Sequence, residues 1–154
     1  MEVGNIVFLK NICFKEGVVD HAFDRGRPCV FIGELDEKMY FVPLASVKNL
    51  KYRDRLRGIL KPNKNNNLTK ICHTNVKELI EKPIAFYEIK GYLNDEELFN
   101  LFNDIKIYYS TIRNEKNRIM VMFADNYMKS FKKYVDYNKK IVKRKWFDFL
   151  FLKC

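Results

Sequence analysis

Residues 27–48, RPCVFIGELDEKMYFVPLASVK, decide the fold of this chain. Two runs rich in β-branched and aromatic residues, 29–33 and 39–44, lie on either side of the polar residues 35–38. Such runs around a short polar segment are typical of a β-hairpin. We therefore predict that the two runs pair as antiparallel strands joined by a tight turn.

Polar and charged side chains flank this hairpin on both sides. His21, Arg25 and Arg27 come before or at the start of the first strand, while Ser46 and Lys48 follow the second. Antiparallel pairing brings the start of one strand to the end of the other. We expect these five side chains to gather at one end of the sheet, where they can form a site.

The same residues carry a resemblance to a known family. Arg27-Pro28 before an apolar strand, and a second strand that ends in residues 43–48 (PLASVK), resemble the ToxN, CptN and AbiQ toxins of type III toxin–antitoxin systems. They are similar, more distantly, to the MazF and PemK endoribonucleases. The chain departs from the family pattern at Ala45, where a hydroxyl residue is usual, and at Val47, where a proline is frequent.

The resemblance implies an α+β fold, namely a small SH3-like antiparallel β-barrel with packed helices. It also implies a toxin that cuts cellular RNA as a sequence-selective endoribonuclease without metal or another cofactor. Inhibition would come from a structured small RNA antitoxin, which the enzyme can itself process, within an oligomeric protein–RNA complex. A protein antitoxin, as in the MazF type, is an alternative.

Composition and charge are compatible with this activity. The 154 residues suit one domain spanning residues 1–154, and 47% hydrophobic residues supply its core. Lys and Arg outnumber Asp and Glu by 29 to 19, a net charge of +10 that favours polyanionic partners or, alternatively, a solvated basic surface. No apolar run reaches about 18 residues and the start lacks a signal peptide, so we expect a cytoplasmic protein without membrane contact.

A basic segment follows the hairpin directly. Its aromatic residue can stack on a base while its cations bind phosphates, as in sites for single-stranded RNA. A solvated face is the alternative. The candidate RNA-binding residues are Arg27, Lys51, Tyr52, Arg53, Arg55, Arg57, Lys61 and Lys64.

Cleavage of RNA without metal needs a base for the 2′-hydroxyl, cations for the phosphoryl oxygens and a proton donor for the 5′-oxygen. His21 titrates near neutral pH and can act as base or acid. Arg25 and Arg27 suit phosphoryl oxygens. Ser46 can donate a hydrogen bond to the same oxygens, and Lys48 can supply charge or a proton. The resemblance carries over Ser46 and Lys48, whereas His21 and Arg25 follow from the loop alone.

Each candidate also has a structural interpretation. Ser46 can cap the turn after its strand, and Arg27 can pair with Glu34 or Asp36. A non-enzymatic RNA- or DNA-binding module is therefore the alternative to the endoribonuclease, which would leave 2′,3′-cyclic phosphate and 5′-hydroxyl ends.

The cysteines and the second histidine point to packing. Cys13, Cys29, Cys72 and Cys154 form no C-x-x-C pair, which argues against a zinc site or a disulfide framework. Adjacent Cys72 and His73 lack a second pair of metal ligands, so we predict no metal site. We predict a structural role for His73, and an approach to the site from a neighbouring strand is the alternative.

The remaining elements follow from periodicity. Strands are predicted at residues 3–9 with 12–14, at 69–76 and at 83–93, with a loop at 15–26, a connection at 77–82 and space for a short helix within 49–60. Asn94 and Glu97 form a helix start, and apolar residues at three- and four-residue spacing predict a helix from about 95 to 114. A second helix, about 118–140, is expected to pack antiparallel to the first.

Overall fold

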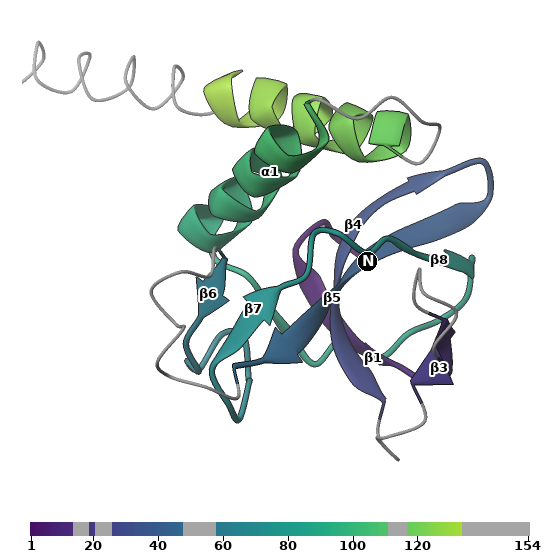
Figure 1. The fold of residues 1–154 in the computed structure, drawn as a ribbon, viewed down its shortest axis with the longest axis vertical. Coiled ribbons are helices and arrows are strands. Elements are labelled where there is room, and N and C mark those ends of the chain that lie inside the picture. Colours follow the sequence, from purple (N-terminus) through teal and green to yellow (C-terminus); the bar gives the residue numbers. More distant parts are fainter. Residues whose placement is uncertain (14–18, 21–25, 48–57, 111–116, 134–154) are drawn as a thin grey trace, which may run out of the picture.

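The computed structural model of the chain describes residues 1–13, 19–20, 26–47, 58–110 and 117–133 (Figure 1). A sheet lies below two helices in this view, so the described part has the predicted α+β class with two C-terminal helices. In chain order its elements are β1 (Asn5–Leu9), β2 (Ile12–Cys13), β3 (Val19–Asp20), β4 (Arg27–Leu35), β5 (Lys38–Ser46), β6 (Ile59–Leu60), β7 (Cys72–Thr74), β8 (Ile80–Pro83), β9 (Gly91–Tyr92), α1 (Asp95–Tyr109) and a helix at residues 117–133.

The predicted hairpin is confirmed as β4 and β5, which pair antiparallel from Cys29 opposite Pro43 to Leu35 opposite Lys38. Its turn consists of Asp36 and Glu37, whose φ angles are 51° and 62°. Two successive positive φ angles match the twist of the flanking strands, as in type I′ turns. A β-bulge interrupts the register between Phe31 and Gly33 and bends β4.

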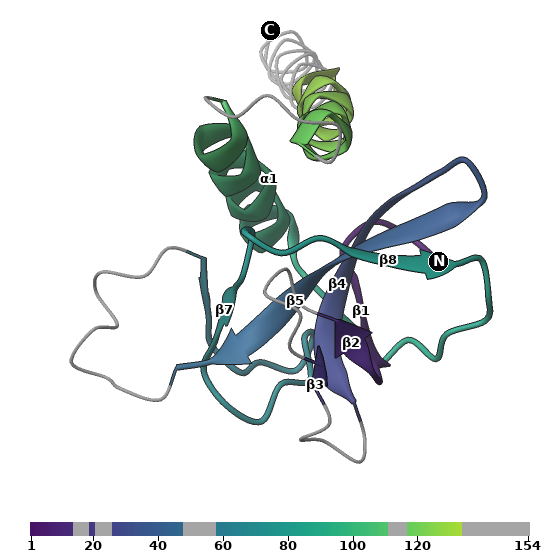
Figure 2. The same ribbon diagram turned by 45° about the vertical axis from the view of Figure 1, so that its right-hand side comes forward.

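The main sheet is antiparallel and curls into a half-barrel (Figures 1 and 2). Its strand order is β6-β7-β5-β4-β1-β9, and β8 pairs with the first half of β5 while β7 pairs with the last residues of β5. The loop after β6 reaches β9, because the Tyr92 amide donates to the Asn65 carbonyl at 3.0 Å. A loop contact therefore bridges the two end strands of this path.

Alternating residues of β4 and β5 pack into two separate cores. Val30 and Val42 lie in the larger core, which includes buried residues of both helices. Phe31 and Phe41 lie in the second core, together with Ile80 of β8. Figure 2 shows the two helices on one side of the β4–β5 pair. Both faces of the hairpin are thus buried, which accounts for its nearly continuous apolar sequence.

The start of α1 follows the sequence prediction. The Asn94 side chain accepts a hydrogen bond from the Glu97 amide at 2.8 Å, and the Glu97 carboxylate accepts one from the Asn94 amide at 3.0 Å. This capping box pairs two amides that the helix itself leaves without partners. The helix ends at Tyr109, short of the predicted residue 114, and its C-cap is Ser110.

The second helix packs against α1 in the expected antiparallel direction. Residues further along α1 meet residues nearer the start of the second helix, in the order Phe99 with Phe131, Phe102 with Tyr127, and Lys106 with Asp125. The Lys106–Asp125 ion pair is exposed and 2.9 Å long, so the aromatic contacts dominate the packing. Residues 134–140 of the predicted helix lie outside the described residues.

Several predicted strand limits are wrong. The expected strand at 83–93 is irregular from residue 84 to 90, because Ile84, Phe86 and Ile89 are exposed by 51%, 93% and 51% and do not belong to a core. The connection predicted at 77–82 instead contains most of β8, and the strand at 69–76 shortens to β7. The predicted loop at 15–26 contains β3. The segment 49–60, in which a short helix was considered, ends in β6.

Asn66 organises the loop that bridges β6 and β9. It is only 1% exposed. Its side chain donates to the Lys61 carbonyl at 2.8 Å and accepts from the amides of Asn63 and Leu68 at 3.0 and 3.1 Å. The asparagine run is therefore a hydrogen-bonded structural loop.

Replacing Asn66 with Ala should lower the free energy of unfolding by about 2 kcal/mol, because it leaves buried backbone groups without partners. Urea denaturation measures this change. Asn103→Ala, at an exposed position of α1, is the matched control and should change stability by less than about 0.5 kcal/mol. Equal effects of the two substitutions would contradict a structural role for the Asn66 loop.

Gly33 lies where β4 meets the second helix, and a Cβ atom there would overlap the Phe123 ring. Gly33→Ala should destabilise the protein by about 1–3 kcal/mol through overpacking. In a Phe123→Leu background the same substitution should cost less, giving a coupling of about 1 kcal/mol between the two sites. Strict additivity in urea denaturation would show that the ring does not set the limit.

Candidate functional site

The hairpin brings Arg27 and the end of β5 together, as the sequence predicted. The Arg27 guanidinium donates through Nη1 to the Leu44 carbonyl at 3.2 Å. Ser46, two residues further along β5, is exposed. Glu34 and Asp36 lie at the opposite end of the hairpin, so the alternative of an ion pair between either carboxylate and Arg27 is wrong.

Three strands end in a row beside Arg27. Ser46 of β5 pairs with Cys72 of β7, which pairs with Leu60 of β6. The next residues continue this order, since the Val47 amide donates to the Ile71 carbonyl at 3.0 Å. Lys61 follows Leu60 directly and is exposed at this edge. We call this end of the sheet, defined by Arg27, Ser46, Lys61 and Cys72, the open end.

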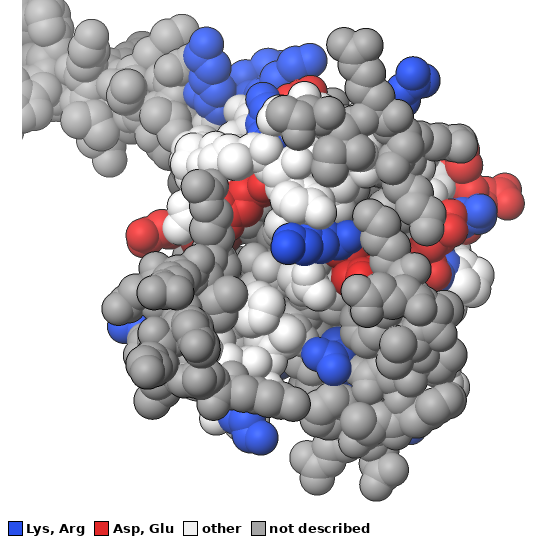
Figure 3. All heavy atoms as spheres, in the orientation of Figure 1, with Lys and Arg blue, Asp and Glu red and all other residues white. Residues whose placement is uncertain are grey.

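Charge differs between the two ends of the hairpin. The turn end carries the exposed carboxylates of Glu34, Asp36 and Glu37, and Figure 3 shows acidic side chains gathered near it. The open end carries Arg27 and Lys61. A polyanion is therefore attracted to the open end and repelled from the turn.

Most of the other predicted site residues lie outside the described residues, and their places stay predictions: His21, Arg25, Lys48, Lys51, Tyr52, Arg53, Arg55 and Arg57. The described neighbours of the basic segment are informative. Val47 bonds to Ile71, as above, and the Gly58 carbonyl accepts from the Thr74 amide at 3.1 Å. Both described flanks of residues 48–57 are thus attached to the β7 region.

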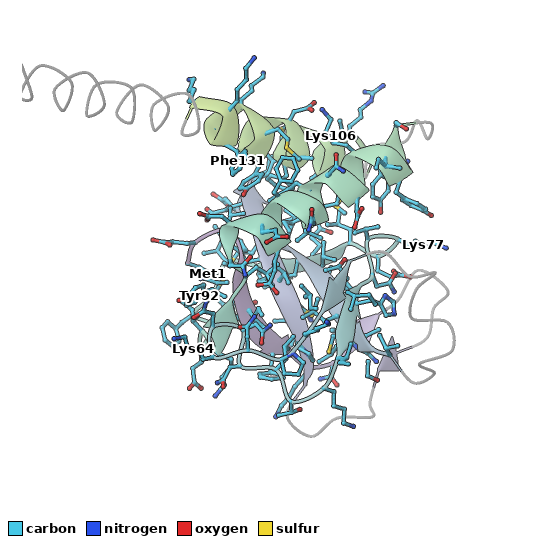
Figure 4. The ribbon with its side chains drawn as sticks, turned by 90° about the vertical axis from the view of Figure 1, so that its left-hand side faces the viewer. Met1, Lys64, Lys77, Tyr92, Lys106 and Phe131 are labelled. Atoms are coloured by element: carbon cyan, nitrogen blue, oxygen red, sulfur yellow. The ribbon has the colours of Figure 1, made fainter. Side chains whose placement is uncertain are left out.

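Lys64 belongs to the asparagine loop. It is exposed, and Figure 4 shows it near Tyr92, on the side of the molecule away from Lys77. The Tyr92 hydroxyl donates to the Asn65 side chain at 3.1 Å, which holds the loop there. Lys64 therefore lies beyond the row of strand ends, toward β9.

His73 is a candidate that the sequence analysis assigned to structure. It lies in β7, opposite Ala45 of β5 and Ile59 of β6, and is partly buried. Burial lowers the pKa of its imidazole below the ordinary 6.5, and a hydrogen bond with the Thr74 backbone opposes this effect. The ring is therefore mainly neutral at pH 7.

The pleat of the sheet separates these side chains between its two faces. Directly opposed residues in an antiparallel pair share a face, and successive residues alternate. Ser46 therefore shares a face with Cys72, and His73 shares the other face with Ala45. Continuing the register from Cys29 opposite Pro43 by two residues sets Arg27 opposite Ala45. Arg27 and His73 thus originate on one face and Ser46 on the other.

Cys72 is a packing residue of the larger core. Burial raises the pKa of its thiol, while the positive charges of Arg27 and Lys70 act in the opposite direction. Cys72 and His73 alternate in one strand and so point to opposite faces, an unsuitable arrangement for sharing a metal ion. Cys29 is likewise buried, and its thiol donates to the Arg27 carbonyl at 3.4 Å.

A second group of cations was not singled out from the sequence. Arg118, Lys129, Lys132 and Lys133 are exposed on the second helix, and Figure 3 shows basic side chains gathered at the top of the molecule. The three lysines stand at three- and four-residue spacing, which places them on one face of the helix. The sequence therefore contained a pattern that indicates a basic surface on a helix.

The sequence matches no protein-family model and no curated protein sequence. Within the described ranges, no helix is both long and apolar enough to cross a membrane.

Titration of His73 should affect folding stability. Because the unfolded chain binds a proton at higher pH than the folded chain, the free energy of unfolding should fall as pH drops from 6.5 through the lowered pKa of His73. Urea denaturation at several pH values measures this dependence. His73→Asn should remove this part of the slope, and an unchanged slope would contradict the lowered pKa.

Proposed function

We propose that this protein is a metal-independent endoribonuclease, the toxin of a toxin–antitoxin system of the ToxN, CptN and AbiQ type. The observation that carries the proposal is the open end of the hairpin. Arg27, which bonds to the Leu44 carbonyl, and Ser46 lie at this end on opposite faces of the sheet. Val47 and Gly58, which flank the basic segment, both bond to the β7 region. This arrangement suits a phosphodiester substrate lying across the strand ends.

The proposed roles follow from the chemistry of RNA cleavage. Arg27 and Arg25 stabilise negative charge on the phosphoryl oxygens, and Ser46 donates a hydrogen bond to them. Of His21 and Lys48, one accepts the proton of the 2′-hydroxyl and the other donates a proton to the leaving 5′-oxygen. The products are a 2′,3′-cyclic phosphate and a 5′-hydroxyl.

The charge distribution supports RNA as substrate and as inhibitor. The chain has a net charge of +10, and its cations include Lys61 at the open end and Lys64 on the adjoining loop. We infer a structured RNA antitoxin that covers these cations in an oligomeric complex, inside the cytoplasm. The curled sheet, bridged between β6 and β9 by the asparagine loop, is interpreted as an SH3-like barrel.

A non-enzymatic nucleic-acid-binding module is the second candidate. Two observations favour it: the pleat sets Arg27 and Ser46 on opposite faces, and further exposed cations lie on the helix of residues 117–133. Such a module needs cations and stacking surfaces but no converging catalytic groups.

The test is cleavage of RNA by the purified protein in excess EDTA, with mapping of the product ends. Ser46→Ala and His21→Ala should each lower the cleavage rate about 100-fold and leave RNA binding nearly unchanged. Ser130→Ala, at an exposed position of the second helix, is the control and should cleave normally. Salt-sensitive RNA binding without cleavage by folded wild-type protein would favour the binding module.

A further inference from the structure

His73 is placed to take part in the chemistry of the open end. It lies in β7, separated from β4 only by β5. The register sets Ala45 between Arg27 and His73 in one cross-strand row, so the side chains of all three leave the sheet on the same face. His73 is the only histidine in the described part of the chain.

The spacing of this row fits a phosphodiester. Neighbouring strands lie about 4.8 Å apart, so β4 and β7 are separated by about 10 Å. Side chains from the two outer strands can therefore reach one group bound above the middle strand. That strand presents Ala45, whose side chain is a single methyl group. The Leu44 carbonyl holds the Arg27 guanidinium beside β5.

We propose that His73 is the general base of the cleavage reaction, acting on a phosphodiester held by Arg27 above Ala45. This inference rests on the proposed endoribonuclease function and changes its site. The base then lies on the same face of the sheet as Arg27. Ser46 lies on the other face and contributes less to the chemical step than His73.

In the reaction, an imidazole nitrogen of His73 accepts the proton of the 2′-hydroxyl. The 2′-oxygen forms a bond to phosphorus, and the bond from phosphorus to the 5′-oxygen breaks. The leaving 5′-oxygen takes a proton from water. The net change is a transesterification without oxidation or reduction, which gives the 2′,3′-cyclic phosphate and the 5′-hydroxyl.

The surroundings of His73 suit a base. Its neighbours across the sheet, Ala45 and Ile59, are uncharged, and the Thr74 hydrogen bond raises the pKa of the ring. A hydrogen bond with that effect is one the ring donates, so the second nitrogen is the one available to accept a proton. Burial has the larger effect on the ring and lowers its pKa below 6.5, so the imidazole is mainly unprotonated before substrate binds.

The experiment measures RNA cleavage in EDTA as a function of pH for wild type, His73→Gln and His73→Ala. Both variants should cleave at least about 100-fold more slowly, with RNA affinity changed less than threefold. The acidic limb of the pH–rate profile should disappear, and added imidazole should restore part of the activity of His73→Ala. Thr69→Ala, an exposed neighbour of β7, is the control and should behave as wild type.

Circular dichroism and urea denaturation identify a variant that fails to fold, and His73→Gln then carries the test because it retains a hydrogen-bond donor. Wild-type cleavage combined with an unchanged rate and pH profile in folded His73→Gln would overturn the role of His73 and leave the endoribonuclease intact. Absence of cleavage by wild type would overturn both. A lower cleavage rate in His73→Gln with the same pH dependence as wild type would also overturn the assignment of His73 as the base.

Discussion

The register of the β4–β5 hairpin is the constraint on which the rest of the structure depends. Both faces of this hairpin are buried, one against the helices and one against β8 and the segment that contains Tyr87. A shift of β4 by one residue relative to β5 would move Phe31 from the second core to the face under the helices. The same shift would turn Arg27 away from the face of His73, so folding and site geometry depend on one alignment.

The turn at Asp36 and Glu37 helps to set this alignment despite an intrinsic cost. Non-glycine residues at positive φ are disfavoured, and this turn has two in succession. The surrounding packing offsets that cost, because Phe31 and Phe41 contact each other across the strands with ring centroids 5.6 Å apart. The carboxylates remain exposed at the turn and concentrate negative charge away from the open end.

Local sequence patterns predicted the elements whose determinants are local. The hairpin follows from two apolar runs around a polar turn. The start of α1 follows from Asn94 and Glu97, which lie three residues apart and bond to each other. The strand prediction was wrong for residues 84–90, because Phe86 has strand-like neighbours but is exposed and packs against no core. Burial is a property of the whole fold and cannot be read from alternation alone.

The site shows the same division. The hairpin pattern was enough to predict that Arg27 lies near the end of β5. The position of β7 beside that end depends on pairing between residues 44–46 and 72–74, which no local pattern indicates. His73 was therefore assigned to structure, although it lies two strands from Arg27. Asn66 was not singled out from the sequence either, yet its hydrogen bonds close a loop.

The pairing of β7 with β5 also explains how adjacent residues acquire different roles. Cys72 and His73 are neighbours in sequence, yet the pleat buries the thiol in the core beneath the helices and leaves the imidazole on the face of Ala45. Burial raises the pKa of the thiol and lowers that of the imidazole, since each loses solvation of its charged form. Both groups are thereby kept neutral near pH 7, but only a neutral imidazole that water or substrate can reach is useful as a base. The partial exposure of His73 meets that condition, and the burial of Cys72 does not.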